Sequence, residues 1–173
     1  KTAVMCFLIA IGTVLFLKNY ILDIRLISGH SMEPALSDGH IAVIWRLAYG
    51  IPMPHVNRYL YRWRMPQQGD VVLYHIDGRD VIKRCVQTEG TALHFIVHPQ
   101  DSAESYAALQ LEGRTIPLTR VQFRNLGGFL PANQQTIPAG FILALGDNTA
   151  QSRDSRDYGF VAAESICGTL LWN

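Results

Sequence analysis

"DVVLYHIDGRDVIKRCV", residues 70–86, holds two short apolar runs on either side of an Asp-Gly pair at positions 77–78. The runs are rich in Val, Ile and Tyr, and an Asp-Gly pair between two such runs is a strong signal for a tight turn. The stretch therefore predicts an antiparallel β-hairpin. Because side chains alternate across a strand, Lys83 in the second arm shares a face with Val81 and Cys85, and that face offers no acidic partner for its ammonium.

The rest of the chain also shows strand signals, which predict a mainly β fold. Four further segments are short, rich in strand-forming residues and bounded by turn residues. These segments are residues 40–45, 92–97, 141–146 and 166–172. Between the second and third of these segments, residues 98–140 predict a small accessory excursion, with a polar stretch at 98–114 and a long loop at 127–140.

Length and charge limit the classes of protein to consider. A chain of 173 residues is long enough for one domain with a sizeable core. The formal net charge is +1 and the mean hydropathy is +0.11, so no bulk charge indicates a nucleic-acid partner. The three cysteines and six histidines show no metal-ligand spacing, and we expect no metal and no cofactor.

The apolar residues concentrate at the N-terminus. Residues 3–17 carry no charge, and the apolar character continues past Lys18 to Leu22. A cleaved signal peptide would be followed by small residues, which are missing here, and a buried core helix would need a helical partner. We therefore predict a transmembrane anchor at residues 1–24, in which Lys18 snorkels, and a β-rich domain at residues 25–173.

One segment stands out by composition. Residues 45–66 contain four arginines and five aromatic residues but no acidic residue. Such a segment is typical either of a solvated loop whose aromatic rings pack locally, or of a membrane-proximal loop. Aromatic rings favour the bilayer interface and arginines favour anionic headgroups, so beside an anchor we expect contact with phospholipid.

The cysteines leave two alternatives open. Cys85 and Cys167 lie in predicted strands and could form a disulfide in an oxidising compartment. Two buried thiols are the preferred interpretation, because free cysteine is among the most buried residue types.

Two other stretches of the sequence indicate a catalytic role for Lys83. A lysine acts as a general base only when it is neutral, and apolar surroundings lower its pKa in that direction. Ser31 lies in the glycine-containing turn "SGHSMEPALSDG", residues 28–39, where a hydroxyl can be exposed. Residues 146–160, "GDNTAQSRDSRDYGF", are dense in hydrogen-bonding groups and suit a scaffold that orients a pair of reacting side chains.

Four segments together resemble the signature boxes of one known family. "SGHSMEP", "QGDVVLY", "VIKRCV" and "GDNTAQSRDSRDYGF" are similar, in order, to the boxes of type I signal peptidases, which use a Ser-Lys dyad. "LAYGIPMP", residues 47–54, is similar to the membrane-proximal loop of the Gram-negative enzymes. The four boxes cover about a fifth of the chain. The short 98–140 region resembles the short peptidases of conjugation systems.

The resemblance implies a role for each matching residue. Ser31 would be the nucleophile and Lys83 the general base, and Ser152 would hydrogen-bond the lysine amine. Two ion pairs would support the site. These pairs are Arg84 with Asp147 and Asp154 with Arg156. Four further residues match positions that line shallow apolar pockets for small substrate side chains. These are Ile27, Met32, Leu36 and Ile82.

The turn before Ser31 departs from the family pattern. Many Gram-negative members carry a serine two residues before the nucleophile, whose hydroxyl stabilises the oxyanion, but this chain has Gly29 there. Ser28 lies one residue too far away, so the oxyanion hole must depend on backbone N–H groups. A Ser-His-Asp triad built on His30 is disfavoured, because adjacent side chains point apart.

The implied function is a membrane-bound serine endopeptidase that removes signal or leader peptides from exported proteins after small residues. It would lie in the bacterial inner membrane as a single-pass protein, with its catalytic domain on the periplasmic side. Its partners would be preprotein leader peptides and phospholipid, with no nucleic acid. Alternatives are a maturation peptidase for a conjugative pilin or transfer protein, a self-cleaving Ser-Lys repressor, and an inactive homologue that binds leader peptides.

Overall fold

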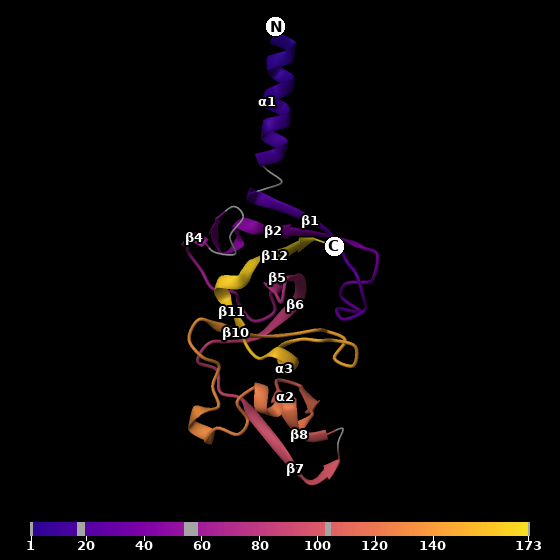
Figure 1. The fold of residues 1–173 in the computed structure, drawn as a ribbon, viewed down its shortest axis with the longest axis vertical. Helices are drawn as coiled ribbons and strands as arrows, with labels where there is room; N and C mark the ends of the chain where they lie inside the picture. The colour runs from indigo at the N-terminus through magenta and orange to yellow at the C-terminus, as the bar shows by residue number, and fades with distance from the viewer. Residues whose placement is uncertain (1, 17–19, 54–58, 103–104, 173) are drawn as a thin grey trace.

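The computed structural model describes residues 2–16, 20–53, 59–102 and 105–172. Their secondary structure is mostly strand, arranged in one sheet of seven strands, one of three and one of two. The predicted mainly β fold class is confirmed. Figure 1 shows the seven-stranded sheet in the middle of the molecule, with the three-stranded sheet at the end opposite the N-terminal helix.

The large sheet carries the residues of interest. Its strand order is β1-β2-β12-β5-β6-β10-β11, and every neighbouring pair is antiparallel. The strands are β1 (Leu22–Leu26), β2 (Ile41–Trp45), β5 (Val71–Ile76), β6 (Arg79–Thr88), β10 (Phe141–Leu145), β11 (Val161–Ala162) and β12 (Ile166–Trp172). Among the described residues β1 and β11 have one strand neighbour each, so the sheet is open and not a closed barrel.

The β5–β6 hairpin forms where the sequence predicts it. Asp77 and Gly78 both have positive φ, 50° and 75°, which is the requirement of the two-residue turn that matches strand twist. The register pairs Val72 with Lys83. On its other side β6 pairs with β10 only from Arg84 to Thr88, so over Arg79–Lys83 no described strand pairs with that edge of β6.

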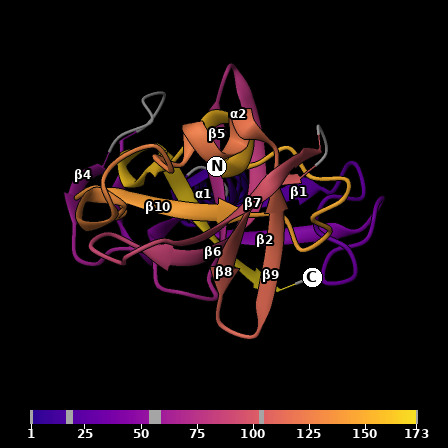
Figure 2. The same ribbon diagram turned by 90° about the horizontal axis from the view of Figure 1, so that it is seen from below.

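The region after β6 contains a three-stranded sheet, of which the sequence predicts only the start of the first strand, at residues 92–97. It consists of β7 (His94–Ser102), β8 (Ser105–Leu111) and β9 (Arg114–Leu118), followed by α2 (Arg120–Asn125) and a short 3-10 turn, η3 (Ala132–Gln134). Figure 2, seen from below, shows β7, β8 and β9 side by side. The expected polar excursion at 98–114 is therefore wrong, because this stretch is mostly paired strand with its own core.

Three clusters of buried side chains form the core. One lies beneath the three-stranded sheet and includes Leu109, Ile116 and Phe123. The other two contact β5: one includes Val72 and Tyr74, with Cys85. The third contains Ile27, Met32, Leu36, Ala42, Ile44, Val71 and Leu73, with Cys167 packed against it. Both cysteines are free thiols, which excludes the disulfide alternative.

The N-terminal helix α1 (Thr2–Phe16) extends away from the sheets, and none of its residues is buried (Figure 1). Within the described residues no helix has the length and apolar character that a bilayer crossing requires. The expected transmembrane helix over 1–24 is thus not found. The helix has 15 residues, Lys18 lies outside the described residues, and Leu22–Leu26 belong to β1.

The arginine-rich segment is partly folded into the molecule. It contains a 3-10 turn, η2 (Arg46–Ala48), and the two-stranded sheet of β3 (Gly50–Pro52) and β4 (Tyr59–Arg62), while residues 54–58 lie outside the description. Tyr49 is fully buried and donates a hydrogen bond to Asp70 Oδ2 (2.7 Å). Leu60, Tyr61 and Trp63 are exposed, so local packing explains only part of the segment.

Candidate active site

Lys83 and Ser31 meet although they lie 52 positions apart in the sequence. Lys83 Nζ lies 2.7 Å from Ser31 Oγ and 3.0 Å from the carbonyl oxygen of Ile82. Only 4% of the lysine is exposed. Burial lowers the pKa of Lys83 below its ordinary value, against a smaller opposing effect of the Asp154 and Asp147 carboxylates. The amine is therefore held beside a hydroxyl under conditions that favour its neutral form.

The turn that carries Ser31 is held by its backbone. Gly29 has φ = 91°, which favours glycine, and its N–H donates to Asp38 Oδ1 at 2.7 Å. The Ser31 carbonyl accepts a hydrogen bond from the Asn148 N–H (3.1 Å). The N–H of Ser31 donates to no partner among the described residues, so it is free to serve an oxyanion as the sequence suggests.

Gly146 lets the polar loop approach this turn. A Cβ added at Gly146 would overlap Ser152 Oγ and lie 2.5 Å from the Ser31 carbonyl oxygen. Contacts that short do not occur, so the close approach of the 146–154 loop to Ser31 requires glycine at this position. The loop, and not only β6, thus determines where Ser31 lies.

Ser152 is near the site but does not make the expected hydrogen bond. Its Oγ is buried and has no hydrogen-bond partner in the part of the chain that the structure describes. The Lys83 amine contacts Ser31 and the Ile82 carbonyl instead. The predicted hydrogen bond from Ser152 to Lys83 is therefore absent here, and the Ser152 hydroxyl is left as an unpaired buried polar group.

Two ion pairs hold the loop. Arg84 Nε and NH2 donate to both carboxylate oxygens of Asp147, at 2.8 and 2.7 Å. Arg156 does the same to the fully buried Asp154, at 2.8 and 3.0 Å. Bidentate pairs of this kind fix geometry as well as charge. The structure thus forms both pairs that the sequence suggests.

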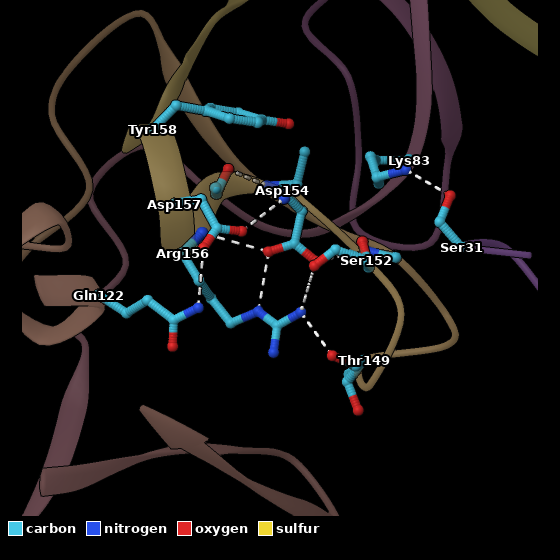
Figure 3. A network of polar contacts seen from close by, with 12 residues as sticks. Ser31, Lys83, Gln122, Thr149, Ser152, Asp154, Arg156, Asp157 and Tyr158 are labelled. Carbon is cyan, nitrogen blue, oxygen red and sulfur yellow. Dashed lines mark hydrogen bonds and ion pairs between the residues drawn. The ribbon is translucent and has the colours of Figure 1, made fainter. Parts of the chain in front are cut away.

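The Asp154–Arg156 pair is the centre of a wider network, shown in Figure 3. Arg156 NH2 also donates to the carbonyl oxygens of Thr149 (2.8 Å) and Ser152 (3.1 Å). Asp154 Oδ2 accepts from the Gly146 N–H at 3.0 Å, and Asp154 caps the N-terminus of α3 (Ser155–Tyr158). Both ends of the 146–154 loop are therefore held by one carboxylate and its guanidinium.

A cleft of about 610 Å³ opens beside the dyad. Its apolar wall includes three of the four predicted substrate-binding residues, Ile27, Met32 and Ile82. The fourth, Leu36, does not line the cleft: it is fully buried in the core cluster behind Met32. The prediction for Leu36 is wrong because the turn after Ser31 points this side chain inward, where the Leu36 N–H bonds to the Met32 carbonyl.

Several lining residues were not predicted from the sequence. The apolar wall also includes Leu26, Leu73, Ile76, Val81 and Tyr158, and the polar part of the cleft includes Arg25, Asp77, Arg79, Asp80 and Arg153. The position of Val81, two residues before Lys83 on one strand face, could have indicated its role. Tyr158 lies in the signature box at residues 146–160, but nothing in that box assigned it to the cleft, and no sequence pattern links Arg25 to it.

The strand edge beside the cleft is open. Residues 79–83 of β6 pair with β5 but, in the described chain, with no strand on the other side. An extended peptide can add to such an edge through main-chain hydrogen bonds, with its side chains in neighbouring pockets. The site therefore combines a serine, a buried amine, a free backbone N–H and a place for an extended chain.

His30 is excluded from this chemistry. Its Nδ1 lies 2.9 Å from Glu33 Oε1, and the side chain is 56% exposed. The Glu33 carboxylate raises the pKa of His30. Among the described residues no group of three His, Cys, Asp or Glu side chains is placed to hold a metal ion.

Comparison with known proteins gives consistent matches. The family model described as "Signal peptidase, peptidase S26" matches residues 1–172. A signal peptidase I of Pseudomonas fluorescens is 25% identical over 187 residues, which cover 90% of this chain and 65% of that protein. A signal peptidase IB of Staphylococcus aureus is 30% identical over 153 residues, covering 83% of this chain and 73% of that protein.

Two further matches complete the comparison. A signal peptidase I of Bacillus caldolyticus is 25% identical over 171 residues, covering 94% of this chain and 84% of that protein. Among solved structures, a signal peptidase I from Enterococcus faecalis V583 is matched with a TM-score of 0.39 and 22% identity, over 62% of this chain and 97% of that one.

Proposed function

Since the chain belongs to the signal peptidase family, peptidase S26, we propose that it is a membrane-bound serine endopeptidase that removes N-terminal signal or leader peptides after small residues. The observation that carries this proposal is the 2.7 Å distance between Lys83 Nζ and Ser31 Oγ inside an apolar cleft. The chain spans 65% of the Pseudomonas fluorescens relative, so the activity of the whole protein is part of the proposal.

In the first step Ser31 is the nucleophile and Lys83 the general base. The neutral amine takes the hydroxyl proton while Ser31 Oγ attacks the carbonyl carbon of the scissile peptide bond. The resulting oxyanion accepts a hydrogen bond from the free N–H of Ser31. The lysine ammonium then gives its proton to the leaving amine, and the upstream part of the substrate stays on Ser31 as an ester.

In the second step water takes the place of the leaving amine. Lys83 accepts a proton from the water, whose oxygen attacks the ester carbonyl, and the proton returns to Ser31 Oγ as the ester bond breaks. The products are the freed leader peptide, ending in a carboxylate, and the original serine. The apolar wall of Ile27, Met32 and Ile82 serves both steps. It excludes bulk water from the Lys83 amine, and it suits the small apolar side chains of the substrate.

We also propose that Ser152, Arg84, Asp147, Asp154 and Arg156 act by positioning the dyad. The proposal is supported by the hydrogen bond from Asn148 to the Ser31 carbonyl, because the two ion pairs hold the loop that carries Asn148. Ser152 packs against Gly146 at the same place.

Membrane attachment is the remaining part of the proposal. The helix α1 carries no charged residue and buries none of its side chains in the rest of the molecule. Exposed apolar residues of β1, β2 and β4 lie at the same end of the molecule as α1 (Figure 1). These are Ile24, Leu26, Ile41, Leu60 and Tyr61. We propose that residues 1–24 anchor a periplasmic domain, residues 25–173, to the bacterial inner membrane, with the 45–66 segment against the lipid.

The test is cleavage of a leader-type peptide with an Ala-x-Ala site by the purified chain in detergent. Wild type is expected to cut after the second alanine, while Ser31→Ala and Lys83→Ala lose the activity and remain folded. Ser37→Ala, a serine of the same turn region outside the cleft, is the matched control and should retain it. Turnover by either dyad variant would refute the proposal.

A further inference from the structure

An ion pair crosses the catalytic cleft at some distance from the dyad. Arg25 NH1 on β1 lies 2.8 Å from Asp80 Oδ2 on β6, and both residues line the cleft. β1 and β6 are not neighbours in the sheet, where β2, β12 and β5 lie between them. Among the side-chain hydrogen bonds and ion pairs of the described residues this pair alone joins β1 to β6, and it therefore bridges the gap between them.

Both members of the pair are held by further partners. Asp23 Oδ2 accepts from Arg25 (2.9 Å) and from Arg46 (3.4 Å), and Asp80 Oδ1 lies 3.0 Å from His75 Nδ1. The pair is thus one link in a chain of polar contacts that begins after β2 and ends on β5. We call the Arg25–Asp80 pair the strap.

The strap lies a fixed number of residues from the dyad. Asp80 precedes Lys83 by three positions on β6, which corresponds to about 10 Å along an extended strand. The β6 edge between them is the part that has no described strand partner on the cleft side. An extended peptide whose scissile carbonyl lies at Ser31 would pair along this edge for three residues and then meet the strap.

The direction of the substrate follows from the place of β1. Its first residue follows α1 by six positions, and Figure 1 shows β1 at the α1 end of the molecule. The upstream part of a leader peptide is an apolar segment. If that segment lies in the membrane with α1, the upstream residues of the substrate are those between Ser31 and the strap.

We propose that the Arg25–Asp80 strap is a specificity-determining element that limits the catalytic cleft to three extended residues upstream of the scissile bond. A fourth extended residue binds only when the strap opens, so the upstream chain turns out of the cleft at that point. The inference rests on the proposed function, because it assumes that the substrate is a leader peptide bound along β6.

A bound substrate can open the strap, because the ion pair is weak. The strength of the ion pair therefore limits how much the strap lowers peptide affinity. Its side chains are 39% and 34% exposed, and partly exposed ion pairs are weak. Opening it lowers the affinity of a longer extended peptide by up to about fivefold. The strap therefore selects among substrates by their shape and does not block the site.

The first measurement is peptide affinity in a Ser31→Ala background, so that nothing is cleaved. Fluorescence anisotropy is followed for peptides with three, four, five or six residues upstream of the scissile bond and a constant downstream part. With the strap intact, affinity should level off beyond the third upstream residue. With Asp80→Ala it should rise further, by about fivefold over the next residues, because new main-chain hydrogen bonds can form.

A second variant separates the strap from a general effect of charge. Arg25→Gln breaks the same ion pair from the other side, and the double variant should behave like either single one, since both remove one contact. Glu112→Gln, an exposed carboxylate in the β8–β9 turn, is the matched control and should keep the wild-type length profile. Additive effects, or an unchanged profile in Asp80→Ala, would overturn the proposal.

The proposed function is tested separately with the wild-type chain, in which Ser31 is intact. Cleavage of the peptide with three upstream residues by the wild-type chain supports the function whatever the longer peptides do. If no peptide is cut but the binding profile changes with Asp80→Ala, the strap stands and the proposed function fails. If peptides are cut and the profile does not change, the strap fails and the function stands.

Discussion

Burial at Lys83 favours the neutral amine, which the proposed reaction needs, and makes the fold less stable, for the same reason. The lysine is 4% exposed and faces one hydroxyl and one carbonyl oxygen, so its charged form loses hydration without gaining a carboxylate in contact. Its pKa is lowered from the ordinary lysine value. Both predictions below follow from that shift.

Activity should rise with pH through a pKa below that of an ordinary lysine. The reaction needs the neutral amine, and burial lowers the pKa of Lys83, so the rising limb of kcat/KM moves to lower pH. The measurement is the pH profile of kcat/KM on a short peptide. The midpoint of its rising limb gives the pKa of the base in the free enzyme. A limb that appears only at the pKa of a solvated lysine would contradict a buried base.

Lys83→Met should stabilise the protein at neutral pH. The folded state holds fewer protons than the unfolded state between the lowered pKa and the ordinary one, so wild-type stability rises with pH across that window. The advantage of the variant is therefore greatest below the lowered pKa and disappears above the ordinary pKa. Urea unfolding of both proteins at several pH values measures it. An advantage independent of pH would point to packing alone.

Gly146→Ala should remove activity through geometry. The new methyl group would overlap Ser152 Oγ and the Ser31 carbonyl oxygen, so the loop and the serine must separate. Displacements of about 1 Å can lower kcat by about 100-fold, and we expect a loss of at least this order. Gly12→Ala, where a Cβ meets nothing within 4 Å, is the control. Retained kcat in Gly146→Ala would show that the approach is not needed.

For single residues, the sequence predicted which side chains belong to the site better than it predicted which atoms they contact. Ser31 and Lys83 could be paired from four ordered motifs, and so could the two ion pairs. The contact of Ser152 and the inward turn of Leu36 could not be predicted, because each depends on how a loop packs against residues far away in sequence. Arg25 gave no signal, since an arginine in a short strand is ordinary.

Among the elements of the fold, the 146–154 loop depends most on a single ion pair for its conformation. Asp154 is fully buried and Arg156 is its charged partner, while the same carboxylate caps α3 and binds the Gly146 N–H. Arg156→Ala would leave a buried carboxylate without its counter-charge. Loss of one partner of a buried pair costs about 3–5 kcal/mol, and we expect a decrease of this size in the free energy of unfolding.

Urea unfolding measures this effect. Arg153→Ala is the control: it removes an arginine three positions earlier whose side chain is 73% exposed and whose contact with Asp77 is 3.8 Å long. A surface pair of this kind contributes little. Equal stability losses in the two variants would mean that burial of the Asp154–Arg156 pair is not what matters.

Some strands of this fold could be predicted from the sequence and others could not. Short apolar runs bounded by turn residues predicted β2, β5, β6, β10 and β12 to within one or two residues. β8 was missed because its buried positions are filled partly by Ala107 and Ala108, which are not strand-forming residues. The apolar N-terminal run gave a helix, but β1 begins inside the predicted anchor.

Across the whole molecule, exposed apolar side chains are more numerous at the α1 end, in α1, β1, β2 and β4, than near α2 at the other end. If the α1 end contacts lipid, Leu60→Ser with Tyr61→Ser should weaken binding to anionic vesicles several-fold, because both side chains are largely exposed in the folded protein. Cleavage of a short soluble peptide should not change. Co-sedimentation with vesicles measures the first effect and a peptide assay the second.

A matched pair at the other end controls for loss of apolar surface. Val121→Ser with Leu130→Ser removes two exposed apolar side chains near α2, which lies away from α1 in Figure 1. This variant should bind vesicles like the wild type. Equal loss of vesicle binding in both variants would show that the molecule has no preferred lipid-facing end.

The register of the β5–β6 hairpin has a consequence for how this protein can change. Lys83 follows Gly78 by five positions, and neighbouring positions on a strand face opposite ways. One inserted or deleted residue between them would turn the amine to the wrong face, whereas two would restore the face but move the amine about 7 Å along it. Length variants should therefore be tolerated in the β8–β9 hairpin and rejected here, even when they fold.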